Sequence, residues 1–245
     1  MKLRELFEAR SLPNENSNGR PIAHTAEALK NFWAWFKGSK VVDEHKRPLV
    51  MYHGTNADFA KFGYEYASAG VGQYGAGFYF TNYPSTASGY AKPDVGSPNV
   101  IPVYLNIKKP MRSNFKTLLS ANDIKSFVYN SPNIASFLSD NYDLPYDLSN
   151  RETVYTIREI IDGFKYGNNR LDQLNLISND LYKNQDEAFL QQCIEITKFD
   201  GVVHKHESGE YFYIAWNSNQ IASAVGASGS YSGTDMINEY NKEDK

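Results

Sequence analysis

Apolar residues recur between residues 25 and 38 with the period of an amphipathic helix. Spacings of i, i+3, i+4 and i+7 place four of them on one face: Leu29, Phe32, Trp33 and Phe36. Thr25 precedes this run as an N-cap, and Gly38 follows it as a stop signal. The pattern predicts a helix whose aromatic face packs into the core.

Short apolar runs with the length and composition of β-strands occupy residues 49–53, 77–81, 100–107, 202–204 and 211–216. Pro102 stands near the start of the third run, which favours an edge strand because proline cannot donate a ladder hydrogen bond. Residues 110–198 show helical periodicity instead. Strands early, helices in the middle and strands late predict an α+β fold rather than a doubly wound sheet.

The same patterns divide the chain. Residues 1–20 are expected to form a short N-terminal helix, at residues 1–10, and a polar linker. Residues 21–226 are expected to form a single domain with a helical insert at about residues 111–198. The Gly/Ser-rich and then charged residues 227–245 are expected to form a flexible tail.

Composition excludes several classes. The chain has 245 residues, 41% of them apolar, enough for one sizeable core, and its net charge of -3 gives no overall basic field toward nucleic acid or membranes. Cys193 is the single cysteine and is expected to be buried, so no disulfide can form within the chain. Without a membrane-length apolar run or a signal peptide, a soluble cytoplasmic protein is expected.

One ordered group of residues carries chemistry. His53, Gly54 and Thr55 end a strand run, a glycine-rich segment follows, Tyr79 lies inside the next strand run, and Tyr90 comes eleven residues after it. This order resembles the first half of the site of NAD+-using ADP-ribosyltransferases. The likeness is to their histidine–tyrosine–glutamate branch, which includes diphtheria toxin and the poly(ADP-ribose) polymerases.

A closer resemblance is to the ADP-ribosyltransferase domains of phage and mobile-element polyvalent proteins. It is carried by residues 31–36, 41–44, 47–50, 52–55, 200–203 and 219–221, and it covers roughly residues 28–108 and 186–226. It implies a split β-sandwich fold and NAD+ as co-substrate, with no metal. It also implies a phage-encoded protein that works in the host bacterial cytoplasm or is carried in the virion.

The resemblance assigns roles to individual residues. His53 would bind a ribose hydroxyl, while Gly54, with Thr55 beside it, would meet the nicotinamide carboxamide through its backbone. Tyr79 and Tyr90 would stack on the two faces of the nicotinamide ring. The polymerases have a serine three residues before the second tyrosine, where this chain has Ala87; Thr86 or Ser88 would have to make that contact.

The third catalytic residue is expected to be a glutamate that leads the last main strand and stabilises the oxocarbenium ion. Glu210 is the first choice and Glu207 the second. An interval of eight from the Asn219-Gln220-Ile221 signature falls on Phe212, which shares a strand face with Glu210, so a bulge or a turn longer by two residues would reconcile them. A site without a glutamate is the third possibility.

Two other motifs have weaker context. Residues 70–75 satisfy G-x-G-x-x-G, but no apolar strand precedes them and a strand follows, which argues against a Rossmann site. His204, His206 and Glu210 resemble the first metal motif of a cupin barrel, but no later histidine follows. In the transferase interpretation, residues 204–207 would instead meet the acceptor.

The sequence therefore predicts an NAD+-dependent ADP-ribosyltransferase with His53, Tyr79 and Glu210 as catalytic residues. It would release nicotinamide and mono-ADP-ribosylate a macromolecular acceptor, a protein first and a nucleic acid second, away from membranes. Three alternatives stay open: an NAD+ glycohydrolase on the same site, a catalytically silent virion-associated interaction module, and a cupin-like metal enzyme. Oligomeric state and acceptor identity have no signal in the sequence.

Overall fold

The computed structural model describes residues 12–56, 62–64, 67, 72–91 and 98–225. The expected N-terminal helix at residues 1–10, the tail from residue 227 and residues 65–66 and 68–71 of the glycine-rich segment lie outside these residues. No helix in the described ranges is long and apolar enough to cross a membrane.

One curled sheet of seven strands forms the centre of the fold, in the order β4-β5-β6-β2-β1-β3-β7. The strands are β1 (Met51–Thr55), β2 (Phe78–Thr81), β3 (Asn99–Leu105), β4 (Pro110–Arg112), β5 (Gly201–Lys205), β6 (Tyr211–Ala215) and β7 (Ile221–Ser223). The pair β4 and β5 is parallel, and the other pairs are antiparallel. The helices of the insert are set apart from this sheet, and the fold is α+β, as predicted.

The sheet divides between β1 and β2. These neighbours share one registered pair, Tyr52 with Thr81, whereas β1 and β3 share five pairs and β2 and β6 share four. The weak junction separates a half made of β4, β5, β6 and β2 from a half made of β1, β3 and β7. A pocket lined by residues of both β1 and β2 lies at this junction.

Helix α2 (Ala26–Phe36) confirms the first prediction. The Thr25 hydroxyl accepts a hydrogen bond from the Ala28 amide at 3.1 Å, and Gly38 follows the helix with a φ of +87°, which suits glycine. Phe32 is fully buried and meets the ring of Tyr104 on β3 edge-on at 5.0 Å. The aromatic face therefore binds α2 to the β1-β3-β7 half of the sheet.

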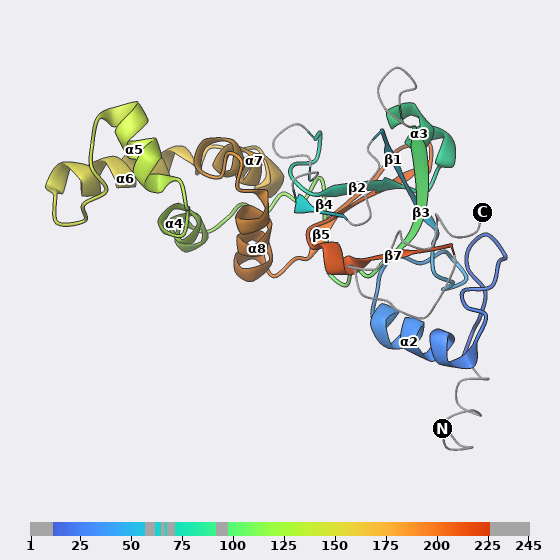
Figure 1. Ribbon diagram of the computed structural model, residues 1–245. Helices are drawn as coiled ribbons and strands as arrows, with labels where there is room; N and C mark the ends of the chain where they lie inside the picture. The colour runs from blue at the N-terminus through green and yellow to red at the C-terminus, as the bar shows by residue number, and fades with distance from the viewer. Residues whose placement is uncertain (1–11, 57–61, 65–66, 68–71, 92–97, 226–245) are drawn as a thin grey trace.

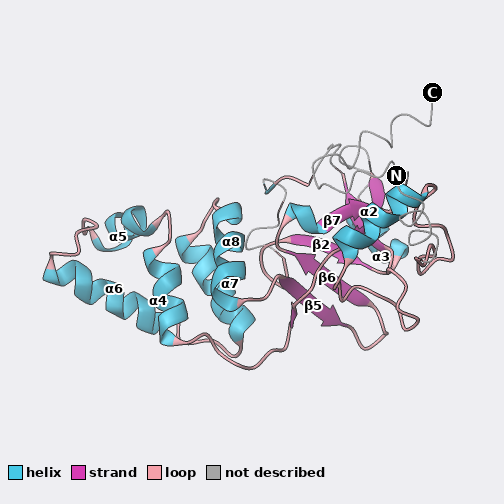
Figure 2. Ribbon diagram, turned by 90° about the horizontal axis from the view of Figure 1, so that it is seen from below, coloured by secondary structure: helices cyan, strands magenta, loops and turns pink. Residues whose placement is uncertain are grey.

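Five helices lie between β4 and β5 in the sequence: α4 (Ala121–Tyr129), α5 (Ile134–Tyr142), α6 (Arg151–Gly163), α7 (Arg170–Leu181) and α8 (Asp186–Thr197). Figures 1 and 2 show them extending from one end of the sheet, opposite α2, with α7 and α8 nearest the strands and α4 to α6 beyond. Helix α8 buries Cys193 completely, as expected, and burial raises its pKa well above the usual value.

The expected strand and insert boundaries need three corrections. Strand β1 runs from Met51 to Thr55 rather than over residues 49–53, so His53 lies within the strand. Residues 110–112, expected to be helical, form β4, and the first helix of this stretch begins at Ala121. Strand β3 is not an edge strand, because β7 lies outside it.

Pro102 is tolerated inside the sheet because β7 is short. Strand β7 pairs only with residues 103–105, so Pro102 lies just past the end of that ladder. Its carbonyl accepts a hydrogen bond from the Ala224 amide at 3.0 Å, on the same side where an amide hydrogen would have pointed. The missing donor therefore breaks no registered pair.

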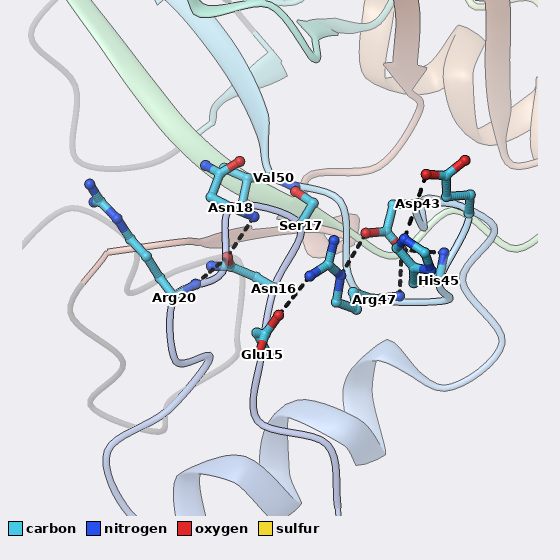
Figure 3. A network of polar contacts seen from close by, with 10 residues as sticks. Glu15, Asn16, Ser17, Asn18, Arg20, Asp43, His45, Arg47 and Val50 are labelled. Atoms are coloured by element: carbon cyan, nitrogen blue, oxygen red, sulfur yellow. Dashed lines mark hydrogen bonds and ion pairs between the residues drawn. The ribbon is translucent and has the colours of Figure 1, made fainter.

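The segment at residues 12–20 is hydrogen-bonded to the domain. Asn16 is buried and donates to the Tyr104 hydroxyl at 2.8 Å, and the Val50 amide donates to the Ser17 hydroxyl at 2.9 Å. Figure 3 shows Arg47 between Glu15 and Asp43, at 2.6 and 2.8 Å. These contacts hold the segment against the turn that leads into β1.

Candidate active site

A pocket of about 850 Å³ lies where the sheet divides, within the range typical of small-molecule sites. Strands β1, β2, β5 and β6 contribute to its lining, together with helix α3 (Pro84–Tyr90), the residues after β4 and the start of α7. Four of the residues expected to bind NAD+ line it: His53, Gly54, Tyr79 and Tyr90. The structure thus brings together motif residues that are spread over almost forty positions.

His53 connects the two halves of the sheet. Its Nδ1 lies 2.8 Å from the carbonyl oxygen of Tyr79 on β2. A carbonyl can only accept, so Nδ1 carries the proton and Nε2 is the acceptor nitrogen of the neutral ring. Burial lowers the pKa of His53, and the bond to the Tyr79 carbonyl offsets only part of this effect, so the ring is neutral at pH 7.

Gly54 has a steric reason to be glycine. A Cβ at this position would lie 1.8 Å from the carbonyl oxygen of Ala87 on α3. Any side chain would therefore push α3, and Tyr90 with it, away from β1. Thr55 ends β1 and is outside the described lining of the pocket.

Tyr79 is held by the backbone of the segment before β2. Its hydroxyl donates to the Gly75 carbonyl at 2.5 Å and accepts from the Tyr74 amide at 3.0 Å. A Cβ on Gly72 would lie 2.0 Å from this hydroxyl, so the segment approaches the ring closely. Burial raises the pKa of Tyr79, and the phenol stays neutral.

Helix α3 presents Tyr90 and Ala87 to the pocket. Tyr90 is the last residue of the helix and is 65% exposed, so its ring is accessible to a ligand. Ala87 is buried at the position where the polymerases have serine. Thr86 is half-buried and Ser88 is exposed, and both lie outside the described lining.

The expected glutamate lies next to the pocket rather than in its lining. Glu210 is 9% exposed, and its Oε1 accepts a hydrogen bond from the Thr81 hydroxyl at 2.5 Å. Thr81 itself lines the pocket, as does Phe212. Glu207 is exposed in the β5–β6 turn. One threonine side chain therefore separates the Glu210 carboxylate from the pocket.

Both histidines of the His-x-His motif line the pocket. The His204 Nδ1 lies 2.8 Å from the Ser113 hydroxyl, and the His206 Nδ1 lies 2.8 Å from the Ser208 hydroxyl. The two histidine rings are 6.4 Å apart, and the carboxylate of Glu210 is bonded to Thr81. Over the described ranges, no three His, Cys, Asp or Glu residues form a group that could hold a metal ion.

The helical insert also contributes to the pocket, which the sequence did not predict. Asn114 follows β4, and Asn169 and Asp172 come from the start of α7. Asn169 is the N-cap of α7 and accepts from the Asp172 amide at 3.0 Å. This Asn-x-x-Asp pattern could have located the start of the helix, but nothing in it indicates that the helix ends at the pocket.

Asp200 and Gln220 belong to the segments that carry the family resemblance, but they lie outside the described lining of the pocket and stabilise turns. The two carboxylate oxygens of Asp200 accept from the amides of Lys108 and Lys109, both at 2.7 Å. Gln220 is buried; its Oε1 accepts from the Trp216 amide at 3.0 Å and its Nε2 donates to the Asp200 carbonyl at 2.8 Å. These contacts fix the ends of β5 and β6 relative to β3.

An α+β fold with a histidine and two tyrosines on one pocket at a division of the sheet defines the class of ADP-ribosyltransferases. The family model described as ADP-ribosyltransferase in polyvalent proteins matches residues 43–231, and the chain belongs to this family. The family uses NAD+ as its substrate, and membership of it makes the chain a transferase. No curated protein and no solved structure matches it.

Proposed function

We propose that this protein cleaves NAD+ at the nicotinamide–ribose bond, releases nicotinamide and transfers one ADP-ribose to a protein acceptor. The convergence of His53, Gly54, Tyr79 and Tyr90 on one pocket carries the proposal. The pocket volume of about 850 Å³ suits a dinucleotide-sized ligand. The short β5–β6 turn at residues 206–210 favours a single transfer, because it offers little surface to hold a growing chain.

His53 and the tyrosines would hold the nicotinamide end of the substrate. The neutral His53 ring, with its proton on Nδ1, presents Nε2 as an acceptor for a ribose hydroxyl. Tyr79 and Tyr90 would offer aromatic faces to the electron-poor pyridinium, which stacking and cation–π attraction favour. Tyr79 is fixed by its hydroxyl, whereas Tyr90 is exposed, so Tyr90 is the ring that adjusts on binding.

Glu210 would stabilise the positive charge that develops on the ribose. A carboxylate acts at short range through a medium of low dielectric without direct contact, and catalytic contacts often tighten only when substrate is bound. Thr81 would position the carboxylate beside the reacting sugar.

One observation favours a second candidate, the catalytically silent module. Glu210 is enclosed and bonded to Thr81, while Phe212 takes the position facing the pocket. If the carboxylate cannot reach its working position, the domain would bind NAD+ without cleaving it. Binding without turnover is the signature of this candidate.

Nicotinamide release from NAD+ tests the proposal, measured with the full chain alone and with bacterial extract added. If the protein transfers ADP-ribose, added extract should stimulate nicotinamide release. Acceptor proteins in the extract should then gain the mass of one ADP-ribose. A glycohydrolase gives release without modified proteins, and a silent module gives neither. The variant His53→Ala, which lacks the ribose contact, should lose the release; a wild type without release in both conditions overturns the proposal.

A further inference from the structure

A serine and a histidine form a rigid pair in the pocket, away from the motif residues. The Ser113 hydroxyl lies 2.8 Å from the His204 Nδ1, and both side chains line the pocket. His204 belongs to β5, and Ser113 directly follows the parallel strand β4 in a turn, where its amide donates to the Val203 carbonyl at 3.0 Å. This backbone bond holds Ser113 beside β5.

Tyr74 packs against one face of the His204 imidazole. The rings of Tyr74 and His204 are stacked, with centroids 4.5 Å apart and planes inclined by 22°. Burial and the neighbouring His206 lower the pKa of His204, which keeps its ring neutral at pH 7. Tyr74 and His206 are the titratable groups beside it, and Asp172 lines the same pocket.

We propose that His204 is the general base that deprotonates the acceptor, and that the acceptor is a hydroxyl group. The proposal assigns the Nδ1-protonated tautomer to His204, with the Ser113 oxygen as acceptor at 2.8 Å. Ser113 is then a positioning residue, and Nε2 is the basic nitrogen. No described residue makes a hydrogen bond to that Nε2. This inference rests on the proposed function and names the acceptor class for it.

The chemistry of the acceptor decides between classes. A carboxylate acceptor has already lost its proton at pH 7 and needs no base. A hydroxyl keeps its proton until it attacks, so a neutral imidazole beside the reacting carbon accelerates its reaction. The hydroxyl oxygen bonds to the ribose carbon, the bond from that carbon to nicotinamide breaks with its electron pair on nicotinamide, and the hydroxyl proton goes to Nε2 and then to water.

Three nucleophiles of known chemistry test the inference without the natural acceptor. Isotope-labelled nicotinamide has no proton to lose at its ring nitrogen, and its exchange into NAD+ reports bond cleavage alone. Water and methanol both need to lose a proton and form ADP-ribose and its methyl glycoside. In His204→Phe, which keeps a ring for Tyr74 to stack on, capture by water and methanol should fall about 100-fold while exchange is retained.

Ser113 and Ser208 offer a matched pair of variants. Each hydroxyl lies 2.8 Å from a histidine Nδ1, but Ser208 lies in the β5–β6 turn outside the described lining of the pocket. Ser113→Ala should lower capture by methanol about fivefold to tenfold at an unchanged KM for NAD+, consistent with the loss of one hydrogen bond. Ser208→Ala should match the wild type.

The pH profile supplies a second readout. Burial and His206 lower the pKa of His204. Capture by methanol in the wild type should therefore stay constant down to the usual histidine pKa of about 6.5 and fall only at lower pH, where the protonated ring cannot accept a proton. His204→Phe should lose this dependence. Equal capture and exchange in His204→Phe and the wild type overturn the inference, whereas a wild type without exchange or release overturns the proposed function itself.

Discussion

The two sides of the pocket differ in whether the residues expected to bind or cleave NAD+ lie in the pocket lining. On the side of β1, β2 and α3, the motif residues His53, Tyr79 and Tyr90 line the pocket. On the side of β5 and β6, Phe212 lines the pocket, while Glu210 lies one step further along the same strand face and is bonded to Thr81. On the first side, close backbone contacts fix the motif residues in the pocket. On the second side, Glu210 lies at the end of the β5–β6 turn, next to the pocket lining.

The β5–β6 hairpin explains the position of Glu210. Its register is continuous from Gly201 with Ala215 to Lys205 with Tyr211, so the paired strands contain no bulge. The His206 amide then donates to the Glu210 carbonyl at 2.8 Å, and Gly209 closes the turn with a φ of +89°. The interval from the Asn219-Gln220-Ile221 signature falls on Phe212 rather than Glu210, and either a bulge or a turn longer by two residues would explain this. The continuous register excludes the bulge and leaves the longer turn.

Removing the charge of Glu210 is the sharpest test of the difference between the two sides. In Glu210→Gln, NAD+ binding should be nearly unchanged, while turnover should fall about 100-fold or more. The reason is that one preorganised contact with a developing charge contributes a few kcal/mol. Nicotinamide release and calorimetric titration with NAD+ measure the two quantities separately.

The exposed carboxylate in the same turn provides the control. Glu207→Gln should leave nicotinamide release at the wild-type rate, because Glu207 is exposed in the turn and outside the described lining of the pocket. The opposite result, an active Glu210→Gln and an inactive Glu207→Gln, would show that the assignment of the catalytic glutamate is wrong.

Thr81→Val tests whether the bond between Thr81 and Glu210 stabilises the fold. The buried carboxylate would lose a hydrogen bond and the Tyr83 amide would lose its bond to the same hydroxyl, which lies 3.1 Å away. The free energy of unfolding should fall by about 1–3 kcal/mol. Thr81→Ser, which keeps the hydroxyl, is the matched control for urea denaturation. Equal midpoints for both variants would mean that Glu210 finds water or another donor.

Periodicity and motif spacing predicted the elements whose signals are local. Helix α2 has the expected cap and stop, and Leu29, Phe32 and Phe36 of its apolar face are buried, while Trp33 is half-buried. Strand β4 was missed because three residues are too few to show a period, and its pairing partner β5 lies about ninety positions away. The prediction that the strand of Pro102 lies at the edge of the sheet is wrong because β7 pairs outside it, and no local pattern in the sequence indicates that pairing.

For the same reason, the pocket was predicted on one side only. Gly54 and the two tyrosines lie in segments that are close together in the sequence, so a motif can include them. The contribution of Asn169 and Asp172 depends instead on how five helices return the chain to the sheet. Phe212 lines the pocket and Glu210 does not, and no local pattern distinguishes the two positions. Sequence pattern therefore predicted short-range contacts better than those created by tertiary packing.

The tyrosine pair tests the better-predicted side with a smaller effect. Tyr79→Ala and Tyr90→Ala should each weaken NAD+ binding about tenfold, since each removes one stacking surface worth about 0.5–1.5 kcal/mol beyond its buried area. Tyr90→Phe should be mild, because the ring makes that contact. Calorimetric titration decides the matter. Unchanged affinity in both alanine variants, with the fold intact by circular dichroism, would exclude stacking of nicotinamide between these rings.

The smallest expected effect concerns the polar edge of the β5–β6 hairpin, where Lys205 and Glu207 are exposed and outside the described lining of the pocket. Replacing both with alanine should reduce transfer to a protein acceptor severalfold while NAD+ hydrolysis stays near the wild-type rate, because docking contributes proximity only for a macromolecular acceptor. Modified protein and free ADP-ribose, quantified in the same reaction, give the two rates. If both rates fall by the same factor, these residues support the site or the fold. The acceptor would then have to be recognised elsewhere, and the start of α7, where Asn169 and Asp172 reach the pocket, is the surface to mutate next.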